Sequence, residues 1–126
     1  MTDRHLVDPP SPFVDEWIRK LSGEIPLPGR ALDVAMGRGR HALLLAAAGF
    51  RTFAVDNKYD AVAEAVERGR QQQLTLRAWC ADLTMSPLPT ERFDLIVVTR
   101  YLQRDLMPAL TNAIVPGGFL LYETFT

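Results

Sequence analysis

The chain has 126 residues, of which 48% are apolar and 23% charged, a composition typical of a soluble globular protein with one core. Its 14 basic and 15 acidic residues leave a net charge of -1, so no overall attraction for nucleic acid is expected. The single cysteine, Cys80, excludes an internal disulfide and a cysteine-rich metal site, and no metal is predicted. Because no membrane span or signal-peptide core is evident, we expect a cytoplasmic protein that does not enter a membrane.

The N-terminal part of the sequence divides into two regions. Residues 1–10 are polar and end in two prolines, so they are predicted to form a flexible arm, and residues 11–126 a single domain. Ser11 and Pro12 suit the cap and the first position of a helix. Apolar residues then recur at helical spacing until Gly23, which is expected to end that helix.

Strands and helices alternate through the rest of the chain. The predicted strands cover residues 30–35, 51–56, 74–80, 93–98 and 119–124. The predicted helices between them cover residues 42–48, 59–69 and 102–115, and a sharp turn is expected at 116–118. This alternation indicates crossover connections and a parallel sheet with helices on both faces, which is a three-layer, doubly wound α/β domain.

The stretch ALDVAMGRGRH, from Ala31 to His41, is the candidate cofactor site. It contains the end of a strand, a turn with Gly37 and Gly39, and the start of a helix. Such a turn lets a ligand approach the backbone and directs the free N–H groups of a helix start toward it. Ligands of open parallel sheets bind beyond the carboxyl ends of the strands, and acidic residues lie at or near the ends of three of the predicted strands: Asp33, Asp56 and Asp82.

Two cofactors fit the glycines equally well. The segment from Gly37 to Ala42 matches the dinucleotide pattern G-x-G-x-x-G/A, and Asp56 lies at about the spacing of a ribose-binding acid, which favours NAD. Asp33 favours the other cofactor. A carboxylate four residues before Gly37 would repel a pyrophosphate and attract a ligand that carries an ammonium and a sulfonium, as S-adenosylmethionine does.

Five segments carry a resemblance to a known family: LDVAMGRGRH, AVD, ADL, FDLIVV and PGGFLLYET, in this order. Together they resemble class I S-adenosylmethionine-dependent methyltransferases, which include small tellurite-resistance-like members, over residues 30–124. The resemblance implies a Rossmann-like sheet of five mainly parallel strands in the order 3-2-1-4-5. It implies a short form that ends after the fifth strand, without the usual C-terminal strands.

The function implied by the resemblance is methyl transfer from S-adenosylmethionine to a small-molecule acceptor. An NAD-binding oxidoreductase remains an alternative on the same glycines. A second alternative is a non-catalytic module that binds S-adenosylmethionine and lacks the part that recognises the acceptor.

The resemblance also implies which residues bind the cofactor. Asp33 would hold the methionine moiety over the backbone of the turn, Asp56 would bind the ribose hydroxyls, and Asp82 would accept from the adenine amine. The implied cofactor-binding residues are Asp33, Ala35, Gly37, Gly39, Asp56, Asp82 and Leu83.

The acceptor side is less well defined by the sequence. Thr99, Arg100 and Tyr101 follow the fourth predicted strand and are candidates for the substrate pocket. A general base is optional for an electrophile as reactive as a sulfonium methyl group. His41 and Tyr101 are weak candidates for that role.

The fifth predicted strand, from Phe119 to Thr124, suggests a partner. An apolar strand at the edge of a sheet exposes unpaired N–H and C=O groups that invite association. We therefore expect a homodimer in which this strand pairs with its own copy across a two-fold axis.

Overall fold

The computed structural model describes residues 9–99 and 104–124. Five parallel strands form one sheet in the order β3-β2-β1-β4-β5, which confirms the predicted fold class and strand order. The strands are β1 (Arg30–Val34), β2 (Arg51–Asp56), β3 (Leu76–Cys80), β4 (Phe93–Thr99) and β5 (Ile114–Glu123).

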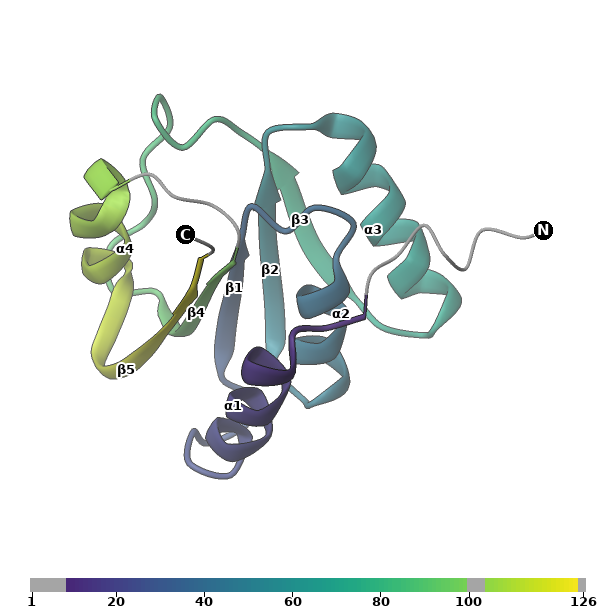
Figure 1. Cartoon of the computed structure of the whole chain (residues 1–126), viewed down its shortest axis with the longest axis horizontal. Coiled ribbons are helices and arrows are strands. Elements are labelled where there is room, and N and C mark those ends of the chain that lie inside the picture. The colour runs from purple at the N-terminus through teal and green to yellow at the C-terminus, as the bar shows by residue number, and fades with distance from the viewer. Residues whose placement is uncertain (1–8, 100–103, 125–126) are drawn as a thin grey trace.

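Helices cover both faces of this sheet. The helices are α1 (Pro12–Ser22), α2 (Arg40–Ala47), α3 (Tyr59–Gln71) and α4 (Met107–Ala113), the last preceded by a 3₁₀ turn at Arg104–Leu106. Figure 1 shows α4 on the far side of the sheet from α1 and α2. Strand β4, which lies between β1 and β5, is therefore covered on both faces, and its residues Leu95–Val98 are at most 1% exposed, as expected of a parallel strand with a continuous apolar run.

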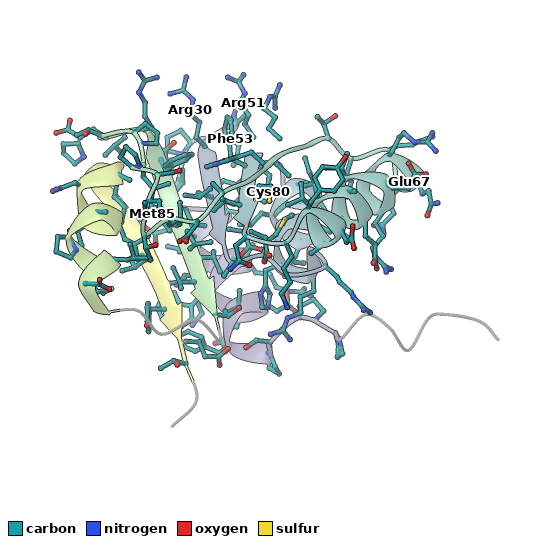
Figure 2. All side chains as sticks on the ribbon, turned by 90° about the horizontal axis from the view of Figure 1, so that it is seen from above. Arg30, Arg51, Phe53, Glu67, Cys80 and Met85 are labelled. Carbon is teal, nitrogen blue, oxygen red and sulfur yellow. The ribbon has the colours of Figure 1, made fainter. Side chains whose placement is uncertain are left out.

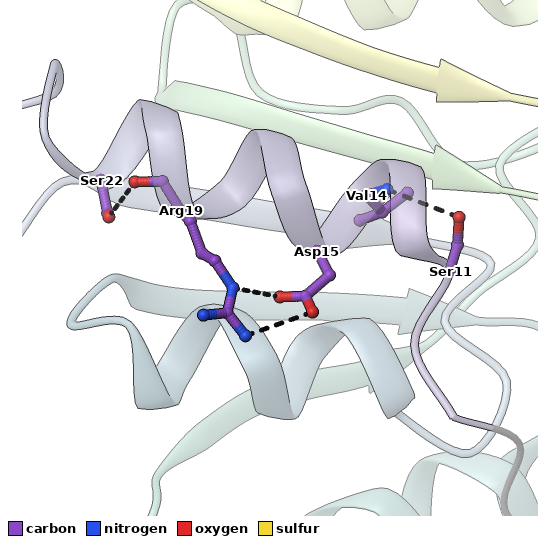
Figure 3. A network of polar contacts seen from close by, with 5 residues as sticks. All are labelled: Ser11, Val14, Asp15, Arg19 and Ser22. Carbon is purple, nitrogen blue, oxygen red and sulfur yellow. Dashed lines mark hydrogen bonds and ion pairs between the residues drawn. The ribbon is translucent and has the colours of Figure 1, made fainter.

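The start of α1 is fixed by its cap, as the sequence predicted. The backbone N–H of Val14 donates to Oγ of Ser11 at 3.4 Å, and Pro12 occupies the first turn. Figure 3 shows this cap together with an ion pair between Asp15 and Arg19 on the helix surface. Val14, Ile18 and Leu21 are buried, whereas Phe13 and Trp17 remain 42% and 38% exposed. The helix thus packs against the core through one narrow apolar stripe.

The prediction for the last helix and strand was wrong in its boundaries. The helix ends at Ala113 rather than at residue 115, and β5 begins at Ile114, so residues 116–118 lie within the strand instead of preceding it. The β4–β5 register shifts from Phe93↔Ile114 to Leu95↔Phe119, which leaves the intervening residues of β5 in a bulge. A Cβ on Gly118 would lie 2.9 Å from the carbonyl oxygen of Asp94, so only glycine permits this close approach. Residues 102 and 103 of the predicted helix lie outside the described residues.

The amino edge of the sheet carries exposed basic side chains. The register pairs Arg30 of β1 with Arg51 of β2, and both side chains are exposed. Figure 2 shows these two arginines projecting in the same direction at one margin of the molecule. In the part of the chain that the structure describes, no helix is long and apolar enough to cross a membrane.

Candidate functional site

Buried polar side chains gather at the carboxyl edge of the sheet. Asp33, Asp56 and Thr99 lie at or beside the ends of β1, β2 and β4, while His41 belongs to the first turn of α2. Ser11, immediately before α1, is also buried and contacts this group through His41. Because burying a polar group is costly unless it is paired, such a concentration indicates a binding or catalytic site.

The turn between β1 and α2 has three residues with positive φ: Ala35 at 58°, Gly37 at 57° and Gly39 at 90°. A Cβ on Gly39 would lie 2.8 Å from Cβ of Ala65 in α3, so this glycine allows α3 to pack closely against the turn. Apart from Gly37 and its two neighbours in the chain, no atom of the described residues lies within 4 Å of a Cβ placed at Gly37. The backbone at Gly37 therefore has open space beside it, as a ligand that approaches the main chain requires.

Asp56 holds the turn in place from the neighbouring strand. Its Oδ2 accepts the N–H of Gly37 at 2.9 Å, and its Oδ1 accepts the N–H of Lys58 at 2.9 Å. The carboxylate is 8% exposed. Since each carboxylate oxygen has more than one acceptor site, Asp56 can hold the turn and still accept from a ligand hydroxyl.

Asp33 is the one acid whose buried oxygens are unsatisfied among the described residues. Its side chain is 1% exposed, and neither Oδ1 nor Oδ2 has a hydrogen-bond partner there. Burial raises the pKa of Asp33 to about 8, although the N–H of Ala42 and the charge of Arg40 oppose the rise. The contact from Ala42 lacks hydrogen-bond geometry and leaves the carboxyl group without a true partner.

A hollow of about 120 Å³ opens beside the turn and brings four of the predicted cofactor residues together. It is lined by Val34, Ala35, Val55, Asp56, Asn57, Ala81, Asp82 and Leu83. Asp82 is exposed, and its Oδ1 accepts both the side-chain hydroxyl and the N–H of Thr84, which together lower the pKa of Asp82. The hollow thus combines apolar side chains with the acidic side chains of Asp56 and Asp82.

The acceptor-side candidates are only partly described. Thr99 is buried at the end of β4, and the pairing of Val34 with Val98 places it beside the start of the turn. Arg100 and Tyr101 lie outside the described residues. His41 is 2% exposed, although no pattern in the sequence predicted that this residue would be buried.

Two contacts of the site had no counterpart in the sequence analysis. The N–H of Ser11 donates to Nε2 of His41 at 2.9 Å, and Arg40 donates to the carbonyl of Pro9 at 2.9 Å. Each joins residues about thirty positions apart. No rule of residue spacing predicts contacts between residues so far apart in the sequence. The preference of serine for helix caps predicted only that Ser11 precedes a helix.

The site is built on a fold that known proteins share. A family model described as a methyltransferase domain matches residues 31–118, which include all but the first residue of β1, the glycine turn, β4 and the bulge in β5. The chain belongs to this methyltransferase domain family. The residues of the turn and the hollow all lie within the matched range.

Curated relatives of this methyltransferase domain are longer proteins. The chain is 28% identical over 130 residues to the ubiquinone biosynthesis O-methyltransferase of Coxiella burnetii, covering 98% of this chain and 53% of that protein. It is 35% identical over 101 residues to hemagglutinin 1 of Eikenella corrodens, covering 75% of this chain and 33% of that protein. The chain thus spans between one third and about half of these relatives.

A solved structure agrees with the domain assignment. An S-adenosylmethionine-dependent methyltransferase from Clostridium acetobutylicum superposes with a TM-score of 0.73 at 27% identity, covering 87% of this chain and 48% of that one. Within residues 9–99 and 104–124, no group of three or more histidine, cysteine or acidic side chains is arranged to hold a metal ion.

Proposed function

We propose that this domain binds S-adenosylmethionine at the glycine turn and transfers its methyl group to a small-molecule acceptor. The observation that carries the proposal is the buried carboxyl group of Asp33, which has no partner among the described residues and lies next to the turn. A pyrophosphate placed here would repel the ionised form of this carboxyl group, whereas an ammonium group would stabilise that form and supply the missing partner. Asp33 therefore favours a cationic cofactor over NAD.

The other site residues suit the remaining parts of this cofactor. Asp56 would accept from the ribose hydroxyls with the lone pairs that the N–H groups of Gly37 and Lys58 leave unused. The hollow beside it would take the adenine, with Leu83 against the ring and Asp82 accepting from the exocyclic amine. Ala35, Gly37 and Gly39 would form the backbone cradle for the methionine moiety.

When bound, S-adenosylmethionine supplies an electrophilic methyl group on a sulfonium centre. The task left to the protein is to hold an acceptor in line with that group and to exclude water. Thr99, at the end of β4 beside the turn, would border the acceptor. Arg100 and Tyr101, which follow Thr99 in the sequence, are further candidates for this role. The similarity to the ubiquinone biosynthesis O-methyltransferase of Coxiella burnetii supports an oxygen acceptor on a small molecule. We place the protein in the cytoplasm, where an exposed free thiol such as that of Cys80 stays reduced.

Calorimetric titration tests the cofactor. We expect the wild-type chain to bind S-adenosylhomocysteine and to leave NAD unbound, and we expect Asp33→Asn to weaken binding at least about tenfold because a charge-assisted contact is lost. Asp94→Asn is the matched control, because this carboxylate lies at the amino end of β4 and accepts the N–H of Arg30. Binding of NAD alone would contradict the proposal.

Turnover tests the reaction itself. The chain would be incubated with S-adenosylmethionine and a panel of catechols and secondary amines, and release of S-adenosylhomocysteine measured. Product with at least one acceptor supports methyl transfer. Tight cofactor binding without product from any acceptor would favour a binding module.

We also propose a homodimer through β5. This strand is at the edge of the sheet in the described structure, and Phe119 on it is 38% exposed. Pairing with the same strand of a second copy would satisfy its outward N–H and C=O groups.

A further inference from the structure

The imidazole of His41 joins three separate elements at the carboxyl edge of the sheet. Its Nε2 accepts the N–H of Ser11, the residue that precedes α1, at 2.9 Å. Its Nδ1 lies 3.4 Å from Oγ1 of Thr99, the last residue of β4. His41 itself stands in the first turn of α2, directly after the glycine turn. One buried ring thus connects the start of α1, the end of β4 and the turn.

The contact from Ser11 determines where the ring carries its hydrogen. A backbone N–H can only donate, so Nε2 of His41 must be the unprotonated nitrogen. The neutral ring therefore has its hydrogen on Nδ1, where it faces the hydroxyl oxygen of Thr99. An imidazolium would set an N–H against the N–H of Ser11 and break the connection to α1.

Arg40, the residue before His41, holds the same segment. Its Nη1 donates to the carbonyl oxygen of Pro9 at 2.9 Å. Two consecutive side chains of α2 therefore bind the chain between Pro9 and Ser11. The first turn of α2 continues from the glycine turn, which Asp56 holds through the N–H of Gly37. A ligand that orders the glycine turn should therefore also order the segment before α1.

We propose that His41 is a positioning residue that couples the glycine turn to the start of α1 and to Thr99. The inference rests on the proposed function, because Thr99 borders the place where an acceptor would meet the methyl group. Both ring nitrogens of His41 are directed at protein groups, so the residue does not act as a general base. Instead it fixes the start of α1 and Thr99 relative to the glycine turn.

Amide hydrogen exchange at Ser11, with and without S-adenosylhomocysteine, tests this coupling. His41→Gln retains an acceptor near the position of Nε2, whereas His41→Asn retains a donor near Nδ1 and loses the acceptor. We expect the Ser11 amide to be protected in the wild type and in His41→Gln, and to be slowed further by the ligand. In His41→Asn it should exchange about tenfold faster and no longer respond to the ligand.

A matched pair at Ser11 tests the contact from its other end. Ser11→Ala removes the capping hydroxyl but keeps the N–H, whereas Ser11→Pro removes both, and the φ of -60° at this position suits proline. The reporter is the amide of Asp15, which donates to the carbonyl of Ser11 at 2.8 Å. Ligand-induced protection of Asp15 should survive in Ser11→Ala and disappear in Ser11→Pro.

The outcomes separate this inference from the function on which it rests. Calorimetry on the same samples shows whether S-adenosylhomocysteine binds. If the wild type binds the ligand but Ser11 does not respond, or if His41→Gln and His41→Asn behave alike, the coupling through His41 is wrong and the proposed function stands. If the wild type binds no ligand, the proposed function and the coupling both fail.

Discussion

The carboxyl group of Asp33 makes the stability of the domain depend on pH. Its pKa rises from 3.8 in the unfolded chain to about 8 in the folded one, mainly because the group is buried. Between these values the folded state keeps a proton that the unfolded state has lost. The stabilisation is fully present below the lower value, and it is lost as pH rises through the upper one.

We therefore predict that the free energy of unfolding of the ligand-free protein falls between about pH 5 and about pH 8 and then levels off. Asp33→Asn should remove most of this slope, because an amide does not ionise. Urea denaturation across this range measures the effect. Asp82→Asn is the control, since Asp82 is exposed with a lowered pKa and should leave the slope unchanged. An unchanged slope in Asp33→Asn would show that another group is responsible.

Ala35 carries local backbone strain at the site. Its φ of 58° is left-handed, which costs an alanine about 1 kcal/mol relative to glycine. We predict that Ala35→Gly stabilises the fold by about this amount and changes affinity for S-adenosylhomocysteine, because Ala35 lines the hollow. Gln73→Gly, at a φ of 62° in the turn before β3, should stabilise equally and leave the affinity unaltered. Equal affinities in both variants would argue against a ligand at Ala35.

Among the elements, the glycine turn contains two glycines with different expected roles. Gly39 allows close packing against α3, whereas Gly37 would face the ligand. Gly39→Ala should destabilise the fold by about 2 kcal/mol, because its Cβ would meet Cβ of Ala65 at 2.8 Å and its φ is 90°. Gly37→Ala should cost about 1 kcal/mol, since only its φ is unfavourable, yet it should weaken ligand binding more. Thermal unfolding and calorimetry distinguish the two variants.

A compensating change provides the control for this prediction. Ala65→Gly removes the atom that Gly39→Ala would contact, so the double variant should recover part of the lost stability. Ala65→Gly should not restore ligand binding when it is combined with Gly37→Ala. Equal destabilisation of both single variants would contradict the packing role of Gly39.

The elements also show what the sequence could predict. The strands up to β4 and the helices α1 to α3 follow from local patterns: apolar runs, the Ser11 cap and the glycines after helices. The end of α4 does not follow from a local pattern, because Pro116, Gly117 and Gly118 are typical of a turn between elements. Their bulge depends instead on the close approach of Gly118 to β4, which is a tertiary contact.

The functional site could also be predicted only in part. The acids Asp33 and Asp56 and the two glycines of the turn were found from their spacing. That Asp33 would be unsatisfied and that His41 would bind the N–H of Ser11 could not be found, since both depend on how α1 and α2 pack on the sheet.

For the molecule as a whole, the edge at β5 determines the expected assembly. We predict that Phe119→Lys leaves the fold intact, because the side chain is 38% exposed, but shifts the protein from dimer to monomer. Light scattering over a range of concentrations measures the change. Trp17→Lys, on the surface of α1, is the control with similar exposure. A wild-type monomer at high concentration would contradict the proposed dimer.

In the proposed complex, the buried carboxyl group of Asp33 receives the cationic end of S-adenosylmethionine. Calorimetry of S-adenosylhomocysteine binding at about pH 7, in two buffers with different ionisation enthalpies, tests it most directly. Because Asp33 is protonated before binding and would be ionised beside an ammonium, we predict the release of about one proton per ligand. Asp33→Asn should bind weakly and release none. Tight binding with no proton released from the wild-type protein would contradict this account.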